Sequence, residues 1–348
     1  MPLHPLYGHE GLRQRLASAA ASARLPQALL LEGPRGVGKQ RLALWLAQLV
    51  LCEGAKATGE PCGACQPCKL VLNLSHPDLH WLVPIEIARK GSDSDKQVEL
   101  AEEALGEEMA ARREQPLYQP TSGLASHGIA SARLLSRQLR LTPALARRKV
   151  FVIGDAERLA VQQGNPEAAN ALLKVLEEPP ADTVVILTSS EPEAIPPTVL
   201  SRVVRLRVHR LPDSVMTQFV QRELGGNGDR ASEQRVSSAE GCIGKLLAGD
   251  NGRKDELAVI AVLAAASQKP ADRYLLALGQ PPFQARGAFT ALLDGLLERL
   301  RSEARAGRDT RAVVSAMARV LDARELAQGN VNPQLLAAVL VEDLSGSA

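Results

Sequence analysis

The stretch that decides the fold is Ala28–Ala43, ALLLEGPRGVGKQRLA. The apolar run from Ala28 to Leu31 predicts a buried parallel strand, and the residues from Arg41 onward predict a helix. Between them lies GPRGVGK, which matches the G-x-x-x-x-G-K pattern of a phosphate-binding loop. Such glycines let backbone N–H groups surround a phosphate, and the helix N-terminus adds positive potential. The alternative is a plain glycine turn, but spacing and context favour a phosphate loop made by Gly33, Gly36, Gly38 and Lys39.

Two positions around this loop lack the groups that usually hold Mg²⁺. Loops of this kind place Ser or Thr after the lysine, whereas this chain has Gln40. Lys149–Ile153 predicts another buried strand, and in nucleotide-hydrolysing proteins the corresponding strand ends in two successive acids. Here Gly154 takes the metal-side position and Asp155 matches the second acid. Because both metal-side groups are missing, we expect no ATP hydrolysis and treat ATP binding by this chain as doubtful.

Composition places the chain among soluble globular proteins. Its 348 residues, 45% hydrophobic and 23% charged, predict two or three domains with ample cores. A net charge of +2 and an aromatic content of 3% argue against strong nucleic-acid binding by the chain alone. The N-terminus lacks the apolar core of a signal peptide, and no run reaches membrane-spanning length. We therefore expect a cytoplasmic protein with no membrane partner, in which disulfides are rare.

Four cysteines follow the loop helix with the spacing C-x9-C-x2-C-x2-C; they are Cys52, Cys62, Cys65 and Cys68. Four thiolates suit tetrahedral Zn²⁺, and each short C-x2-C step lets one turn present two sulfurs to the ion. The alternatives are redox-active cysteines or paired disulfides, which a reducing compartment disfavours. We predict a structural zinc site, because four protein ligands leave no open position for water. Cys242 is remote in sequence and is expected to be a buried core thiol, and His76 and His80 are expected to be turn and core residues.

The remaining segments are less specific. Residues 85–128 contain a polar stretch and then a possible helix over Lys96–Arg113 whose acidic residues predict a solvated face. We interpret this piece as a partly mobile insertion. After residue 206 the pattern is mostly helical, and five apolar-periodic segments between 257 and 343 predict a helical bundle.

The chain resembles bacterial DNA polymerase III clamp-loader subunits of the delta-prime type, in the AAA+ superfamily. The resemblance runs through most of residues 1–206 and rests on five features: Gly33–Lys39, the four cysteines, His76-Pro-Asp78, the run NALLKVLEEPP at 170–180, and Ser201-Arg202. The family usually has Ser-Arg-Cys at the last of these, and this chain has Ser201-Arg202-Val203. Since the cysteine is not the charged group, the departure leaves the role of the arginine untouched.

The resemblance implies an architecture. Residues 1–206 would form an α/β AAA+ domain that carries the zinc module at 52–68 and the insertion at 85–128. Residues 207–250 would form a small helical lid, and residues 251–348 an all-α collar through which the subunits oligomerise. The periodicity alone predicts only a bundle, so the collar role is an analogy.

The resemblance also implies a function in DNA replication. The chain would be a stator subunit that helps load the ring-shaped sliding clamp onto primed DNA, as part of the DNA polymerase III holoenzyme. Its partners would be gamma or tau motor subunits and delta in a hetero-oligomer, with the clamp and primer-template DNA reached through the complex. Arg202 would be an arginine finger donated to ATP on a neighbouring subunit, because a guanidinium is planar, always charged and bidentate toward phosphate. The simpler alternative is a surface arginine in a salt bridge.

Two other functions stand beside this interpretation. The chain could be an ATP-hydrolysing motor subunit of the same superfamily, against which Gln40 and Gly154 argue. It could instead be a zinc-dependent protein that binds DNA directly, against which the low net charge and few aromatics argue.

Overall fold

The protein is described from a computed structural model. The described residues are 3–54, 59–85, 94–115, 117, 127–159, 173–226, 230–247, 249–280, 289–305, 307, 310–327 and 331–345. Within them the chain forms two compact units, the first running to Leu247 and the second comprising the residues that follow.

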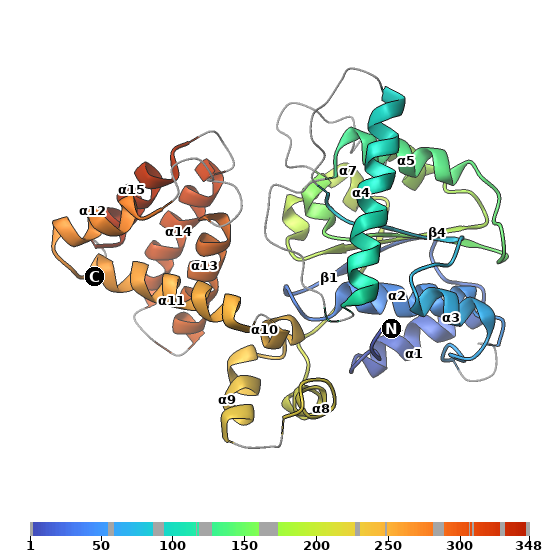
Figure 1. Ribbon diagram of the computed structural model, residues 1–348, viewed down its shortest axis with the longest axis horizontal. Helices are drawn as coiled ribbons and strands as arrows, with labels where there is room; N and C mark the ends of the chain where they lie inside the picture. Colours follow the sequence, from blue (N-terminus) through green and yellow to red (C-terminus); the bar gives the residue numbers. More distant parts are fainter. Residues whose placement is uncertain are drawn as a thin grey trace. The chain divides into compact units, whose positions relative to one another are not determined.

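A five-stranded parallel sheet organises the first unit (Figure 1). Its order is β2-β3-β4-β1-β5, with β1 (Ala28–Glu32), β2 (Leu79–Leu82), β3 (Lys149–Ile153), β4 (Thr183–Ser189) and β5 (Val204–Arg207). All four pairings are parallel, so the strands end at one edge of the sheet. The phosphate loop after β1 therefore lies beside the residues that follow β3 and β4. The α/β prediction is confirmed.

Alternate residues of the strands build one hydrophobic core on each face of the sheet. Leu30 and Phe151 point to one face, while Leu29 and Val150 point to the other. The first face is covered by α4 (Ser94–Glu114), α5 (Ile129–Leu139) and α7 (Pro197–Leu200). The opposite face is covered by α1 (Glu10–Ala21), α2 (Lys39–Leu51) and α3 (Gln66–Leu72), as Figure 1 shows. Two short 3₁₀ turns, η1 (Ala156–Leu159) and η2 (Pro192–Ala194), follow β3 and β4.

Helix α4 confirms the helix predicted over Lys96–Arg113. It begins at Ser94 and ends at Glu114, and its side chains Val98, Ala101 and Leu105 are buried in the first core. The acidic residues Glu99, Glu102, Glu103 and Glu107 are exposed, as the solvated-face prediction requires, whereas Glu108 is half-buried and pairs with Arg112 at 2.9 Å. The flanking residues 86–93 and 118–126 lie outside the described part, so the predicted mobility there is not addressed.

The last helices of the first unit form a small group with its own core. They are α8 (Asp213–Glu223), α9 (Arg230–Ala239) and α10 (Ile243–Leu247). Phe219, Val236 and Ile243 meet in this core, and Tyr7 joins it from the N-terminal segment. The Tyr7 hydroxyl donates to a Glu223 carboxylate oxygen at 2.6 Å. The N-terminal segment therefore ties this helical group to the α/β part.

The second unit is helical throughout its described part. Its helices are α11 (Gly249–Ala266), α12 (Pro270–Leu278), α13 (Thr290–Arg305), α14 (Thr310–Ala327) and α15 (Pro333–Ser345). Buried apolar side chains such as Leu293, Val320 and Val341 share one core, so the predicted bundle is confirmed. Among the described residues, no helix has both the length and the apolar character needed to span a bilayer.

Candidate functional site

The phosphate loop has the backbone shape that its glycines predict. Gly36 and Gly38 have φ angles of 78° and 100°, a region that side chains rarely adopt. A Cβ atom on Gly33 would lie 2.2 Å from the Val208 carbonyl oxygen, so only glycine fits there. The loop thus connects β1 to α2 at the expected place. What differs from an open phosphate site is where the polar groups point.

Lys39 is turned into its own loop. Its Nζ donates to the carbonyl oxygens of Gly33 and Pro34, both at 2.8 Å, and to Ser190 Oγ at 3.1 Å. The residue is only 5% exposed, and this burial lowers the pKa of Lys39 to about 8, although Glu157 and Asp155 nearby favour the charged form. An ammonium group has three N–H donors. All three are accounted for within the protein, so Lys39 has none left for a phosphate in this conformation.

Helix α10 lies directly against the loop. The Gly244 N–H donates to the Gly36 carbonyl oxygen at 2.8 Å. A Cβ atom on Gly244 would come within 2.6 Å of the Gly36 Cα, so the two backbones touch. The small helical group therefore covers the outer side of the phosphate loop.

Gln40 and Gly154, the two residues that depart from a magnesium site, lie next to each other. A Cβ atom on Gly154 would meet three Gln40 atoms first, with Nε2 at 2.9 Å and Cδ at 3.0 Å. The Gln40 side chain thus fills the position where a side chain at residue 154 would begin. The Gly154 carbonyl oxygen lies 2.7 Å from Nε2 of His127. Burial lowers the pKa of His127, so the neutral ring donates from Nε2 to this carbonyl; sequence analysis did not single out His127.

The two acidic residues after β3 form hydrogen bonds with the end of β4 and with the residue that follows it. The Asp155 backbone N–H donates to Thr188 Oγ1 at 3.2 Å, and Asp155 has a φ of 49°. Glu157 Oε1 accepts the Ser190 N–H at 3.2 Å. Burial, and then the Asp155 charge, raise the pKa of Glu157. Asp155 alone is a poor substitute for a paired metal shell, because Mg²⁺ binds through several oxygen ligands in near-ideal octahedral geometry.

The four predicted cysteines come together at the other end of α2. Cys52 caps the C-terminus of α2, Cys65 precedes α3, and Cys68 lies in α3. All four sulfurs lie within 4.8 Å of one another. The Cys52–Cys65 and Cys62–Cys68 sulfur pairs are each 3.9 Å apart. Sulfurs placed at about 2.3 Å around a tetrahedral Zn²⁺ would stand about 3.8 Å apart, so this donor set fits zinc.

Local contacts act on individual cysteines and fasten the cluster to the domain. Backbone N–H groups of Cys65 and then Ala64 lower the pKa of Cys62 to about 6, whereas burial raises the pKa of Cys52 and of Cys68. Glu60 accepts the Trp45 Nε1–H at 2.8 Å and pairs with Arg13 at 2.7 Å. The segment that carries Cys62 is thereby tied to α1 and α2. A four-cysteine site of this kind supplies architecture rather than catalysis.

Arg202 lies at the surface, between α7 and β5. Its Nη2 pairs with Glu177 Oε1 at 2.7 Å, and its Nη1 donates to the Thr198 carbonyl at 2.8 Å and to Ser201 Oγ at 3.2 Å. These partners are not residues of the phosphate loop. Arg202 therefore has both the exposed guanidinium that an arginine finger needs and the salt bridge of the simpler alternative. The partner Glu177 was not predicted, although it lies in the LEEPP run.

The His-Pro-Asp run has a structural role. The Asp78 carboxylate accepts the backbone N–H groups of Ala144, Leu145 and Ala146 at 2.6 to 2.8 Å. These bonds keep the pKa of Asp78 below its usual value against the opposing effect of burial. His80 stacks on Phe151 with ring centroids 4.6 Å apart. The prediction that the nearby histidines are turn and core residues is confirmed.

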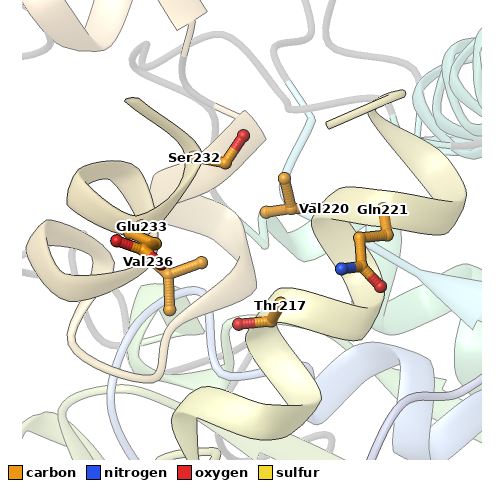
Figure 2. A pocket seen from close by; sticks show the side chains of 6 residues that line it. All are labelled: Thr217, Val220, Gln221, Ser232, Glu233 and Val236. Carbon is orange, nitrogen blue, oxygen red and sulfur yellow. The ribbon is translucent and has the colours of Figure 1, made fainter. Parts of the chain in front are cut away.

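One concave pocket is remote from all of these groups. It lies between α8 and α9 and has a volume of about 230 Å³ (Figure 2). Its lining residues are Thr217, Val220, Gln221, Ser232, Glu233 and Val236. None of them belongs to the phosphate loop or to the cysteine cluster, so the pocket is separate from both motifs.

Comparisons with known proteins agree with the arrangement of the first unit. A family model described as "DNA polymerase III, delta subunit" matches residues 8–212. DNA polymerase III subunit delta' of Pseudomonas aeruginosa is 36% identical over 220 residues, which are 63% of this chain and 54% of that protein. The delta' subunit of Bacillus subtilis is 30% identical over 203 residues, 58% of this chain and 48% of that protein.

A different subunit type also matches. DNA polymerase III subunit tau of Bacillus subtilis is 26% identical over 254 residues, which are 73% of this chain and 36% of that protein. The chain thus spans about half or less of the length of these relatives. Because the family model covers more than half of this chain, the chain belongs to the family described as DNA polymerase III, delta subunit.

Proposed function

We propose that this chain is a delta-prime-type stator subunit of the DNA polymerase III clamp loader. In this role it helps load the sliding clamp onto primed DNA together with gamma or tau motor subunits and delta. It donates Arg202 to ATP held by a neighbouring motor subunit and does not hydrolyse ATP itself. Residues 207–250 serve as the lid and residues 251–348 as the collar that joins the subunits.

The observation that supports the proposal most strongly is that the polar groups of the phosphate loop are already bonded within the chain. Lys39 uses its three N–H donors on Gly33, Pro34 and Ser190, and α10 touches the loop at Gly36. A nucleotide at this loop would have to displace these contacts, and Gln40 and Gly154 offer no hydroxyl or carboxylate for Mg²⁺. A subunit with these properties serves the complex through its shape and its surfaces.

Arg202 supplies the chemistry that such a subunit can give to a neighbour. It lies at the surface with 34% of its side chain exposed, so another chain can reach it. A guanidinium stays charged at any physiological pH, and it stabilises the charge that builds up on a transferring phosphoryl group. The cysteine cluster supports this role only as architecture, because zinc with four thiolate ligands has no open position.

The test is ATP turnover by a loader reconstituted from this chain and its partner subunits, stimulated by clamp and primed DNA. Arg202→Ala is expected to slow turnover at the neighbouring site by on the order of 10³-fold, the usual worth of an arginine finger. Lys39→Ala is expected to leave it unchanged. Arg205→Ala is a matched control, since Arg205 is also an exposed arginine that pairs with a glutamate of its own chain, Glu32, at 2.7 Å.

The competing candidate is a motor subunit, which the likeness to tau favours. In that case Lys39→Ala would slow turnover as much as Arg202→Ala does, and the isolated chain would show Mg²⁺-dependent hydrolysis. Either result would overturn the stator proposal.

A further inference from the structure

The guanidinium of Arg202 is held on two sides by its own chain. Glu177 Oε1 accepts from Nη2, while the Thr198 carbonyl and Ser201 Oγ accept from Nη1. Arginine has five N–H donors. Three contacts therefore fix the head group, and two N–H groups remain for a further acceptor.

The chain places Glu177 at this point through packing rather than through local sequence. Residues 173–177 are helical, and the following Pro179-Pro180 cannot continue the helix. Leu176 is buried in the same core as Val199, which lies three residues before Arg202. The two segments are thus held together beneath the surface, and the ion pair lies at the rim of that core.

The exposure of the pair indicates what it contributes. The side chains of Arg202 and Glu177 are 34% and 48% exposed. Ion pairs in such positions add little to folding stability. An unrestrained arginine, however, loses much rotamer freedom when it is fixed against a phosphate. A partner that fixes the head group beforehand reduces that loss.

We propose that Glu177 is the positioning residue for Arg202, holding its guanidinium in the orientation in which the two remaining N–H groups meet the phosphate of a neighbouring subunit's ATP. This inference rests on the proposed arginine-finger function. It assigns a role to the first glutamate of the LEEPP run that the second, Glu178, does not share.

The experiment compares Glu177→Ala with Glu178→Ala in the reconstituted loader. Both residues are exposed, adjacent and equally charged, so the two variants change net charge alike. Glu177→Ala is expected to lower kcat by about tenfold, because small displacements of a positioned group are costly, with KM for ATP nearly unchanged. Glu178→Ala is expected to behave as the unmodified chain. Glu177→Gln keeps an acceptor and is expected to recover part of the loss.

Two further measurements separate positioning from a general structural effect. The melting temperatures of both alanine variants are expected to equal that of the unmodified chain. In an Arg202→Ala background, Glu177→Ala is expected to have no additional effect, since its only route to the reaction is through Arg202.

The outcomes distinguish the two proposals. If Arg202→Ala leaves turnover unchanged, the arginine-finger function itself is wrong. If Arg202→Ala slows turnover but Glu177→Ala matches Glu178→Ala, raises kcat, or adds to the Arg202→Ala loss, then Glu177 does not position the finger.

Discussion

The two ends of helix α2 carry two motifs that differ in what their polar atoms offer to a ligand. At the N-terminal end the phosphate loop keeps its glycine backbone, but its lysine binds the carbonyl oxygens of its own loop. At the C-terminal end the cysteines present four sulfurs at tetrahedral spacing. A motif therefore shows that a backbone shape persists, whereas the partners of its polar atoms decide whether a ligand can bind.

The largest effect of a single substitution is expected at the cysteine end of α2. Cys65→Ser is expected to reduce zinc content and to destabilise the protein by about 3 to 5 kcal/mol, because loss of a metal is among the largest single-site effects. Metal analysis and urea unfolding measure this, with Cys242→Ala as the control that keeps zinc. Unchanged zinc content and stability in Cys65→Ser would refute a structural metal site.

The next largest effect is expected at Gln40 and Gly154, which contact each other beside the phosphate loop. Gly154→Asp is expected to cost about 1 to 2 kcal/mol, because the terminal amide of Gln40 must move aside to admit its Cβ. Gln40→Thr in the same chain should recover at least about 1 kcal/mol of that loss, which a double-mutant cycle measures. Additive effects of the two changes would show that the side chains do not compete for space.

Lys39→Ala tests the loop itself. Its removal leaves the half-buried carbonyl oxygens of Gly33 and Pro34 without their donor, so a loss of about 1 kcal/mol is expected in urea unfolding. Lys174→Ala removes an exposed lysine and is expected to have no effect. A protein that keeps its stability after Lys39→Ala, but loses affinity for a fluorescent ATP analogue, would instead carry an open phosphate site.

The smallest effect is expected from mild acid. Burial lowers the pKa values of several histidines, among them His9 beside the phosphate loop and His127 at Gly154. The unfolded chain then binds more protons below its histidine pKa of about 6.5, so stability falls with decreasing pH. Between pH 7 and pH 6 we expect each histidine that stays neutral in the folded protein to contribute a loss of up to about 0.7 kcal/mol. A stability that rises over the same interval would contradict the buried neutral rings.

The elements that sequence analysis predicted well have local signals. An apolar run followed by glycines predicts β1 and the loop, cysteine spacing predicts the cluster, and helical periodicity predicts the bundle. The buried face of helix α4 was not predicted, because its buried residues Val98, Ala101 and Leu105 are diluted by acidic neighbours. Only packing against the sheet shows that they belong to the core.

The groups that sequence analysis missed depend on contacts between distant residues. Glu177 meets Arg202, Gly36 meets Gly244, and His127 meets Gly154 across separations that no local pattern encodes. The sequence shows that positions 40 and 154 lack the groups that bind magnesium. It does not show that the Gln40 side chain fills the space where a side chain at position 154 would begin. Such pairings follow from the tertiary fold alone.

The contact between Gln40 and Gly154 has a consequence for building a magnesium site at this loop. An acid at position 154 alone must push the end of the Gln40 side chain aside, and a hydroxyl residue at position 40 alone empties the space beside Gly154 without supplying a carboxylate. Neither change by itself supplies both magnesium ligands, so a metal site here requires both positions to change together.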